Sequence, residues 1–100
     1  MENKLFIYGT LINSEVQKNV LGRVIKTVPD ELIGYRKSEI KIEDENYPLI
    51  IPDKKERVKG LVIEVTNYEL KKIDEYESNS YKREEIILKS GISAWVYVKG

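Results

Sequence analysis

The chain has 100 residues, of which 41% are apolar and 34% charged, a composition typical of one globular domain over residues 1–100. Lys plus Arg and Asp plus Glu number 17 each and are interleaved, so neither a nucleic acid nor a membrane is an expected partner. Cysteine and histidine are absent, which excludes disulfides, thiolate chemistry and the usual neutral-pH general base. With no apolar run of transmembrane length and no signal-peptide pattern, we expect a cytoplasmic protein.

The first elements in chain order are a buried strand and a short helix. The apolar run Lys4–Tyr8 ends at Gly9 and predicts the strand. Ser14 with Gln17 fits a capping box, and this predicts a helix that ends near Gly22.

The middle of the chain predicts short strands broken by turns. The expected strands are residues 23–28, 32–35, 38–42 and 47–52. Pro29-Asp30 and the polar patch Asp53–Glu56 are the turn signals.

The last third predicts a strand, a helix and two further strands. Residues 58–66 alternate as a strand, with Gly60 as a candidate bulge. Thr66 with Glu69 forms a second capping-box pattern, which opens a helix over residues 67–77. Strands follow at 81–89 and 92–98. About six short strands and two short helices predict an α+β fold with a small, mostly antiparallel β-barrel.

Glu77 is the candidate catalytic acid in the second helix. At 100° per residue it falls between Leu70 and Ile73 in projection, on the apolar stripe, whereas Glu75 faces solvent. A carboxylate on an apolar face loses hydration, which raises its pKa and suits proton transfer near neutral pH. Two other interpretations stay open: Glu77 is solvated or ion-paired at the helix end, or Asp74 is the buried acid.

The sequence "YGTL", residues 8–11, joins the first strand to the first helix. Gly9 allows a sharp turn and close approach of a ligand, and consecutive amides at such a turn can bind an anion. The residues of a nucleotide-binding loop are missing.

The order of several blocks resembles the γ-glutamylcyclotransferase-like (AIG2-like) superfamily in its small prokaryotic branch. The blocks are "LFIYGTL" (5–11), "YPLI" (47–50), "VKGLVIEVTNYELKKIDEYE" (58–77), "YKREEI" (81–86) and "AWVYV" (94–98). The resemblance spans nearly the whole chain. It implies a compact β-barrel flanked by helices, with a glutamate on the floor of a cavity.

The resemblance also implies functional residues. The family's YGTL backbone binds the α-carboxylate and amine of a γ-glutamyl group, and the matching residues here are Tyr8, Gly9, Thr10 and Leu11. The family motif LDxYE ends in the general acid/base glutamate.

In this chain the motif is "IDEYE" (73–77), which assigns that role to Glu77. Tyr81 and Tyr97 match aromatic positions that line the cavity. One departure is the segment Ser78-Asn79-Ser80, which is short and lacks the family's Gly after the glutamate, so we expect a tighter loop.

The implied reaction is closure of a γ-glutamyl group to 5-oxoproline with release of an amine. The substrate is a small γ-glutamyl amine or peptide, and neither a cofactor nor a metal is required. The amides of residues 9–11, or Tyr81, are candidates to stabilise the developing oxyanion. The alternative is a non-catalytic module on the same fold that binds a small carboxylate or a protein. We expect a monomer or a weak homodimer.

Tyr47 and Trp95 are each open to two interpretations. Tyr47 is either an edge of the cavity or a packing residue, and Trp95 either packs in the core or stacks on a ligand. Tyr35, Tyr68 and Tyr76 are most simply surface or half-buried residues.

Overall fold

The structure is a computed structural model that describes residues 2–100, apart from the side chain of Ile42. The elements in chain order are β1 (Glu2–Ile7), the 3-10 turn η1 (Thr10–Ile12), α1 (Ser14–Leu21), β2 (Val28–Ile42), β3 (Glu45–Thr66), α2 (Asn67–Glu77), the 3-10 turn η2 (Ser78–Ser80), β4 (Tyr81–Ile87) and β5 (Ser93–Lys99).

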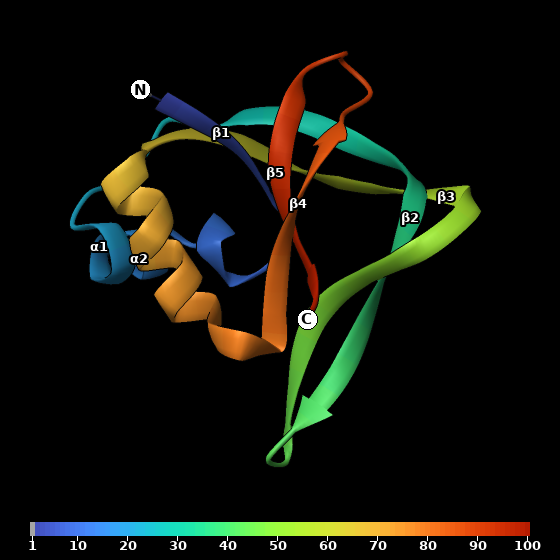
Figure 1. The fold of residues 1–100 in the computed structure, drawn as a ribbon, viewed down its shortest axis with the longest axis horizontal. Helices are drawn as coiled ribbons and strands as arrows, with labels where there is room; N and C mark the ends of the chain where they lie inside the picture. The colour runs from blue at the N-terminus through green and yellow to red at the C-terminus, as the bar shows by residue number, and fades with distance from the viewer. Residues whose placement is uncertain (1) are drawn as a thin grey trace.

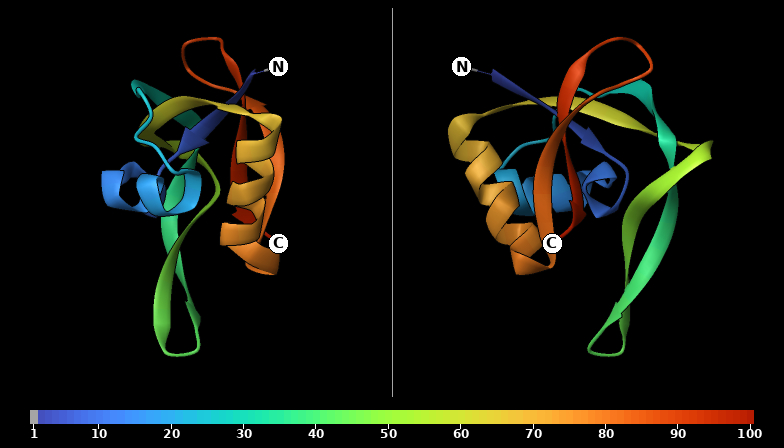
Figure 2. Two further views of the ribbon diagram at one scale, coloured as in Figure 1. Left: turned by 90° about the vertical axis from the view of Figure 1, so that its left-hand side faces the viewer. Right: turned by 45° about the vertical axis from the view of Figure 1, so that its right-hand side comes forward.

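The strands of residues 2–100 form one curled sheet in the order β2-β3-β1-β5-β4. All neighbouring strands are antiparallel except β1 and β5, which run parallel. Helices α1 and α2 lie together on one side, and the long β2–β3 hairpin extends away from them (Figure 1). The right view of Figure 2 also shows α2 at one side of the molecule and the hairpin extending from the other. The predicted α+β fold with a curled, mostly antiparallel sheet is confirmed, with five strands in place of about six.

The strand count differs because β2 and β3 are long. Residues 28–42 form one strand through Pro29-Asp30, and residues 45–66 form one strand through Asp53–Glu56, so both predicted turns are wrong. Pro29 is tolerated because β2 is an edge strand. The expected strand over 23–28 is also wrong, since only Val28 belongs to β2.

The irregularity of this hairpin lies at Gly34 and not at Gly60. The pairing jumps from Ile33 opposite Arg57 to Tyr35 opposite Pro52, and Gly34 has φ of +88°. Gly60 serves close packing, because an added Cβ would clash with the carbonyl oxygen of Ile7 and with the ring of Phe6. The expected bulge at Gly60 is therefore wrong.

The first helix begins differently from the prediction. The N-cap of α1 is Asn13, whose side chain accepts a 2.8 Å hydrogen bond from the amide of Glu15. Gln17 is buried and forms no capping box with Ser14; its amide donates to the carbonyl of Leu11 (2.8 Å) and accepts from the amide of Ile25 (3.0 Å). Gln17 thus joins η1, α1 and the segment before β2.

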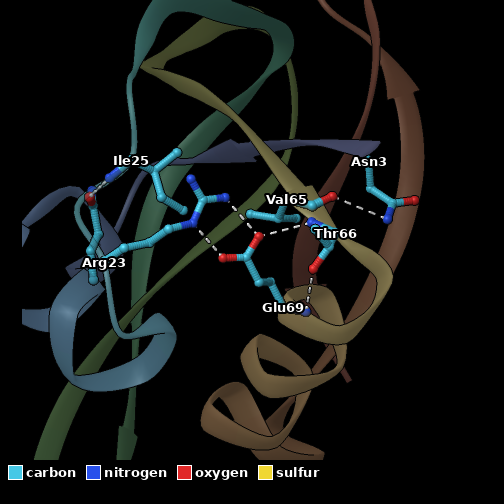
Figure 3. Close-up of polar contacts among 7 residues, drawn as sticks. Asn3, Arg23, Ile25, Val65, Thr66 and Glu69 are labelled. Carbon is cyan, nitrogen blue, oxygen red and sulfur yellow. Dashed lines mark hydrogen bonds and ion pairs between the residues drawn. The ribbon is translucent and has the colours of Figure 1, made fainter. Parts of the chain in front are cut away.

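The second helix begins as predicted. Thr66 and Glu69 form the reciprocal capping box of α2, with hydrogen bonds of 3.0 and 3.1 Å. Arg23 reaches over from the segment after α1 and donates two hydrogen bonds, of 2.7 and 2.8 Å, to the same carboxylate (Figure 3). The N-terminus of α2 is therefore fixed to the segment that follows α1.

Apolar side chains fill both faces of β1, which explains its continuous apolar run. Phe6 and Tyr8 pack in the core enclosed by the curled sheet, and Leu5 and Ile7 pack in the core under the helices. In β5 the predicted alternation of side chains between the two faces holds. Val96 packs in the core enclosed by the curled sheet, and Tyr97 packs in the core under the helices. No helix of residues 2–100 is long and apolar enough to cross a bilayer.

Candidate active site

A cavity of about 390 Å³ opens near the carboxyl ends of β1 and β5. The two parallel strands pair at one position, Leu5 opposite Trp95, and the chain then continues into the turn after β1. The lining residues are 6–11, 47–48, 76–78, 80–81 and 97. The volume lies in the range of small-molecule sites, and every residue predicted for substrate binding or catalysis lines this one cavity.

Glu77, the last residue of α2, brings the acidic group to this cavity. It is partly buried at the end of the stripe that carries Leu70 and Ile73, whereas Glu75 is exposed. Within residues 2–100 its carboxylate makes no hydrogen bond and no ion pair. Loss of hydration raises the pKa of Glu77 from 4.5 to about 7, so both protonation states are populated near neutral pH.

Asp74, one turn earlier, is a structural acid. Its carboxylate accepts hydrogen bonds of 2.6 and 3.0 Å from Arg83 and one of 2.7 Å from the hydroxyl of Tyr97. Burial opposes its ionisation, but these hydrogen bonds and the charge of Arg83 outweigh burial and lower the pKa of Asp74. Asp74 therefore stays ionised and is not the acid with the raised pKa.

The turn after β1 supplies main-chain donors. The hydrogen bonds of η1 use the amides of Ile12 and Asn13, which bond to the carbonyls of Gly9 (3.2 Å) and Thr10 (3.0 Å). The amides of residues 9–11 are left without an acceptor among residues 2–100. Gly9 also fits closely against the other wall, since an added Cβ would lie 3.1 Å from Pro48 Cγ.

Three tyrosines form walls of the cavity with their hydroxyl groups already hydrogen-bonded. Tyr8 donates to the carbonyl of Tyr97 (2.6 Å), Tyr97 to Asp74, and Tyr81 to the carbonyl of Pro48 (2.5 Å). Burial is the main cause that raises all three pKa values, to about 12 for Tyr81. The protons of these hydroxyl groups are therefore retained at neutral pH.

Sequence reasoning missed Tyr76 as a residue of the cavity. It is exposed at the surface, in line with the expected surface or half-buried position, but it also lines the cavity, and its hydroxyl lies 2.7 Å from Thr10 Oγ1. Its position directly before Glu77 was the available signal, but the contact with Thr10 joins residues 66 positions apart in the sequence. Tyr47, for which the sequence left two interpretations open, lines the cavity together with Pro48. Trp95 packs against Arg83, whose guanidinium carbon lies 4.6 Å from the centre of the Trp95 ring.

The segment after Glu77 is the single 3-10 turn η2. Ser78 has φ of +62° and ψ of −166°, a region that glycine adopts and other residues avoid. Ser78 therefore adopts, at a conformational cost, a backbone conformation that favours glycine.

Residues 5–100 match the family described as gamma-glutamyl cyclotransferase, AIG2-like. The chain belongs to this family. AIG2-like protein D of Arabidopsis thaliana is 34% identical over 85 residues, which are 84% of this chain and 55% of that protein. The chain thus spans about half the length of this curated relative.

Two solved structures extend the comparison. One described as gamma-glutamyl cyclotransferase superimposes with a TM-score of 0.86 at 15% identity, covering 100% of this chain and 68% of the other, which shows the shared fold. An uncharacterized protein from Pyrococcus horikoshii superimposes with a TM-score of 0.72 at 25% identity, covering 98% and 78%. The family expected from the sequence is confirmed.

Proposed function

We propose that this protein is a γ-glutamyl cyclotransferase that converts a γ-glutamyl amine or small γ-glutamyl peptide into 5-oxoproline and a free amine. The observation that carries the proposal is the pairing, in one cavity, of the unpartnered Glu77 carboxylate with the unused amides of residues 9–11. Family membership supports the reaction class. Assignment to the small prokaryotic branch is part of the proposal and is supported by the likeness to the P. horikoshii protein.

The amides of residues 9–11 bind the substrate's α-carboxylate in this proposal. Consecutive main-chain N–H groups in a turn form a concave anion site, and a carboxylate satisfies donors that otherwise lack an acceptor. The rings of Tyr8, Tyr81 and Tyr97 enclose the aliphatic part of the γ-glutamyl group.

Glu77 transfers protons during ring closure. It takes a proton from the α-ammonium, the freed amine attacks the γ-carbonyl carbon, and a C–N bond forms. The old amide C–N bond then breaks as the departing nitrogen is protonated by Glu77. The attacking nitrogen loses two protons in all and both end on the departing nitrogen, so the products are a neutral lactam and an ammonium ion. A pKa of about 7 lets the same group accept and return each proton.

Positioning supplies the rest of the rate acceleration. A γ-glutamyl chain is flexible in water, and holding its carboxylate at one end of the cavity and its amide at the other favours the ring-closing conformation. Well-oriented intramolecular reactions of this kind gain about 7 kcal/mol or more. The hydroxyl proton of Tyr81 is already donated to Pro48, so we assign oxyanion stabilisation to the main-chain amides.

The test is formation of 5-oxoproline from a panel of γ-glutamyl amines and dipeptides by wild type, Glu77→Gln and Glu75→Gln. Glu77→Gln keeps the size of the side chain but cannot accept a proton, so we expect a loss of at least about 100-fold in kcat. Glu75→Gln removes an exposed carboxylate from the same helix turn and should retain activity.

Equal activity of wild type and Glu77→Gln would remove Glu77 from its assigned role. If wild type releases no 5-oxoproline from any compound yet binds them in titration calorimetry, the alternative of a non-catalytic module that binds small carboxylates replaces the proposal.

A further inference from the structure

The last turn of α2 is attached to the sheet through the carboxylate of Asp74. This carboxylate accepts hydrogen bonds of 2.6 and 3.0 Å from Arg83 in β4 and one of 2.7 Å from the hydroxyl of Tyr97 in β5. Arg83 and Tyr97 lie directly opposite each other in the pairing of the two strands. One helix side chain therefore joins the end of α2 to both strands at the same level.

The guanidinium of Arg83 is held from two directions. Its central carbon lies 4.6 Å from the centre of the Trp95 ring, and only 25% of the side chain is exposed. Both of its hydrogen bonds to Asp74 are charge-assisted, and the planar fork fixes the orientation of the carboxylate that it binds. The two side chains thus form a pair with a defined place and no net charge.

Glu77 has no comparable attachment of its own. Its carboxylate makes no hydrogen bond and no ion pair within residues 2–100, so the backbone at the end of α2 decides where it lies. Asp74 precedes Glu77 by three residues, a spacing that brings two helix side chains to the same side, with Cβ atoms about 5–6 Å apart. Tyr97, the other partner of Asp74, is a wall of the cavity. The contacts of Asp74 therefore locate both Glu77 and that wall.

We propose that Arg83 and Asp74 are positioning residues for the reaction: as one neutral pair they hold the end of α2, and with it Glu77, at the cavity. The inference rests on the proposed function and adds two residues to it. Neither residue lines the cavity; both border a neighbouring groove that shares Tyr97 with it. Both therefore act through Glu77 and Tyr97 and not by touching the substrate.

Steady-state kinetics with the γ-glutamyl compound that wild type converts fastest test the positioning. Asp74→Asn keeps the size of the side chain but loses the charge-assisted hydrogen bonds, so we expect kcat to fall about 10- to 100-fold, the cost of misplacing a reacting group by about 1 Å. KM should change by less than about threefold, because the amides of residues 9–11 belong to another element and still bind the α-carboxylate. As the control, Glu31→Gln breaks the ion pair with Lys89, beyond the other end of β4, and should keep both constants.

The ionisation of Glu77 gives a readout that a merely structural role would not change. It is followed by NMR of the glutamate side-chain carboxyl carbons, and the Glu77 signal is identified by its loss in Glu77→Gln. Tyrosines are the titratable groups that face Glu77 from the other elements, and they retain their protons near neutral pH: Tyr8 after β1, Tyr47 in β3, Tyr81 in β4 and Tyr97 in β5.

The two halves of the pair should shift the titration of Glu77 in opposite directions. Asp74→Asn leaves the positive charge of Arg83 without its partner, which favours the ionised form of Glu77 and lowers the midpoint. Arg83→Gln leaves the negative charge of Asp74 without its partner and raises the midpoint. We expect each shift to be about 0.3–0.5 pH units, the effect of one unit charge at about 6–10 Å in water. The double variant should return the midpoint to the wild-type value.

Arg83→Lys separates charge from geometry and provides a second variant if Arg83→Gln does not fold. It keeps the positive charge but loses the planar fork, so we expect the wild-type midpoint together with a lowered kcat. Wild-type kcat and midpoint in folded Asp74→Asn would overturn the inference and leave the proposed function intact. If wild type releases no 5-oxoproline, the proposed function fails, and the NMR titration still decides the inference: opposite shifts support the action of the pair on Glu77, and shifts of one sign or none overturn it.

Discussion

Asp74 and Glu77 lie one turn apart at the end of α2 and have opposite electrostatic surroundings. Asp74 accepts two hydrogen bonds from Arg83 and one from Tyr97, which lower its pKa despite burial. Glu77 borders the cavity, and burial raises its pKa to about 7. One helix turn thus carries an acid that stays charged and an acid that can gain and lose a proton, which is a pattern typical of acid–base sites.

Glu77 should destabilise the fold as pH rises. Its folded-state pKa of about 7 lies above the ordinary value of 4.5, so the folded state holds the proton more tightly than the unfolded state. Stability is therefore unaffected below about pH 4.5, falls as pH rises to about 7 and is then constant, with a total cost of up to about 3 kcal/mol.

We expect Glu77→Gln to unfold at higher denaturant concentration than wild type at pH 8 and to differ little at pH 4.5. Glu75→Gln is the matched control and should follow the wild-type profile. If Glu77→Gln raised the stability equally at both pH values, the raised pKa of Glu77 would be contradicted.

The clamp between Glu69 and Arg23 should give the opposite pH dependence. The hydrogen bond from Arg23 is the largest cause that lowers the pKa of Glu69 from 4.5 to about 2, followed by burial, which opposes it, and the hydrogen bond from the Thr66 amide. The contribution of the ionised Glu69 carboxylate to the stability of the fold is present above pH 4.5 and is lost as pH falls toward 2. Because Arg23 is half-exposed, we expect Glu69→Gln to cost only about 2 kcal/mol at pH 7.

The cost of Glu69→Gln should shrink toward zero at pH 2, measured by urea unfolding at each pH. Glu64→Gln changes an exposed glutamate on β3 and serves as the control. A cost that stays constant between pH 2 and pH 7 would mean that the ion pair does not lower the pKa of Glu69.

Replacing Ser78 by glycine should stabilise the protein. The positive φ of Ser78 costs about 1–3 kcal/mol, and relief of that strain exceeds the extra unfolded-state entropy of glycine, about 0.5–1 kcal/mol. We expect a net gain of about 1 kcal/mol in thermal unfolding. Asn79→Gly, at the neighbouring position without a positive φ, should instead lower stability.

Gln17 should be essential to the packing of α1. Gln17→Leu has similar volume but leaves the Leu11 carbonyl and the Ile25 amide without their partner in a buried place. Each unsatisfied group costs about 1–3 kcal/mol, so we expect a loss of about 2–4 kcal/mol in chemical denaturation. Lys18→Leu alters an exposed neighbour on the same helix, and a Gln17→Leu protein as stable as that control would show that the two hydrogen bonds contribute little.

The amino-acid sequence alone determined the features that depend on neighbouring residues. The apolar run before Gly9 predicts a strand buried on both faces, and Thr66 with Glu69 predicts the start of α2. The projection of Glu77 onto the stripe of Ile73 indicated the interior but left a solvated or ion-paired position open. These features follow from local periodicity and capping, which are written in short stretches of sequence.

Only the tertiary structure decided what depends on distant partners. Pairing of β2 with β3 overrides the turn signal at Pro29-Asp30, because a strand partner satisfies backbone groups that a turn would otherwise satisfy. Asp53–Glu56 lies where that pairing is interrupted, between Arg57 and Pro52, and still belongs to one long strand β3. The ionised state of Asp74 depends on Arg83 in another element, and the place of Tyr76 at the cavity depends on Thr10, 66 positions away. No short stretch of sequence encodes such contacts, since they form only when the sheet curls and brings its strand ends against the end of α2.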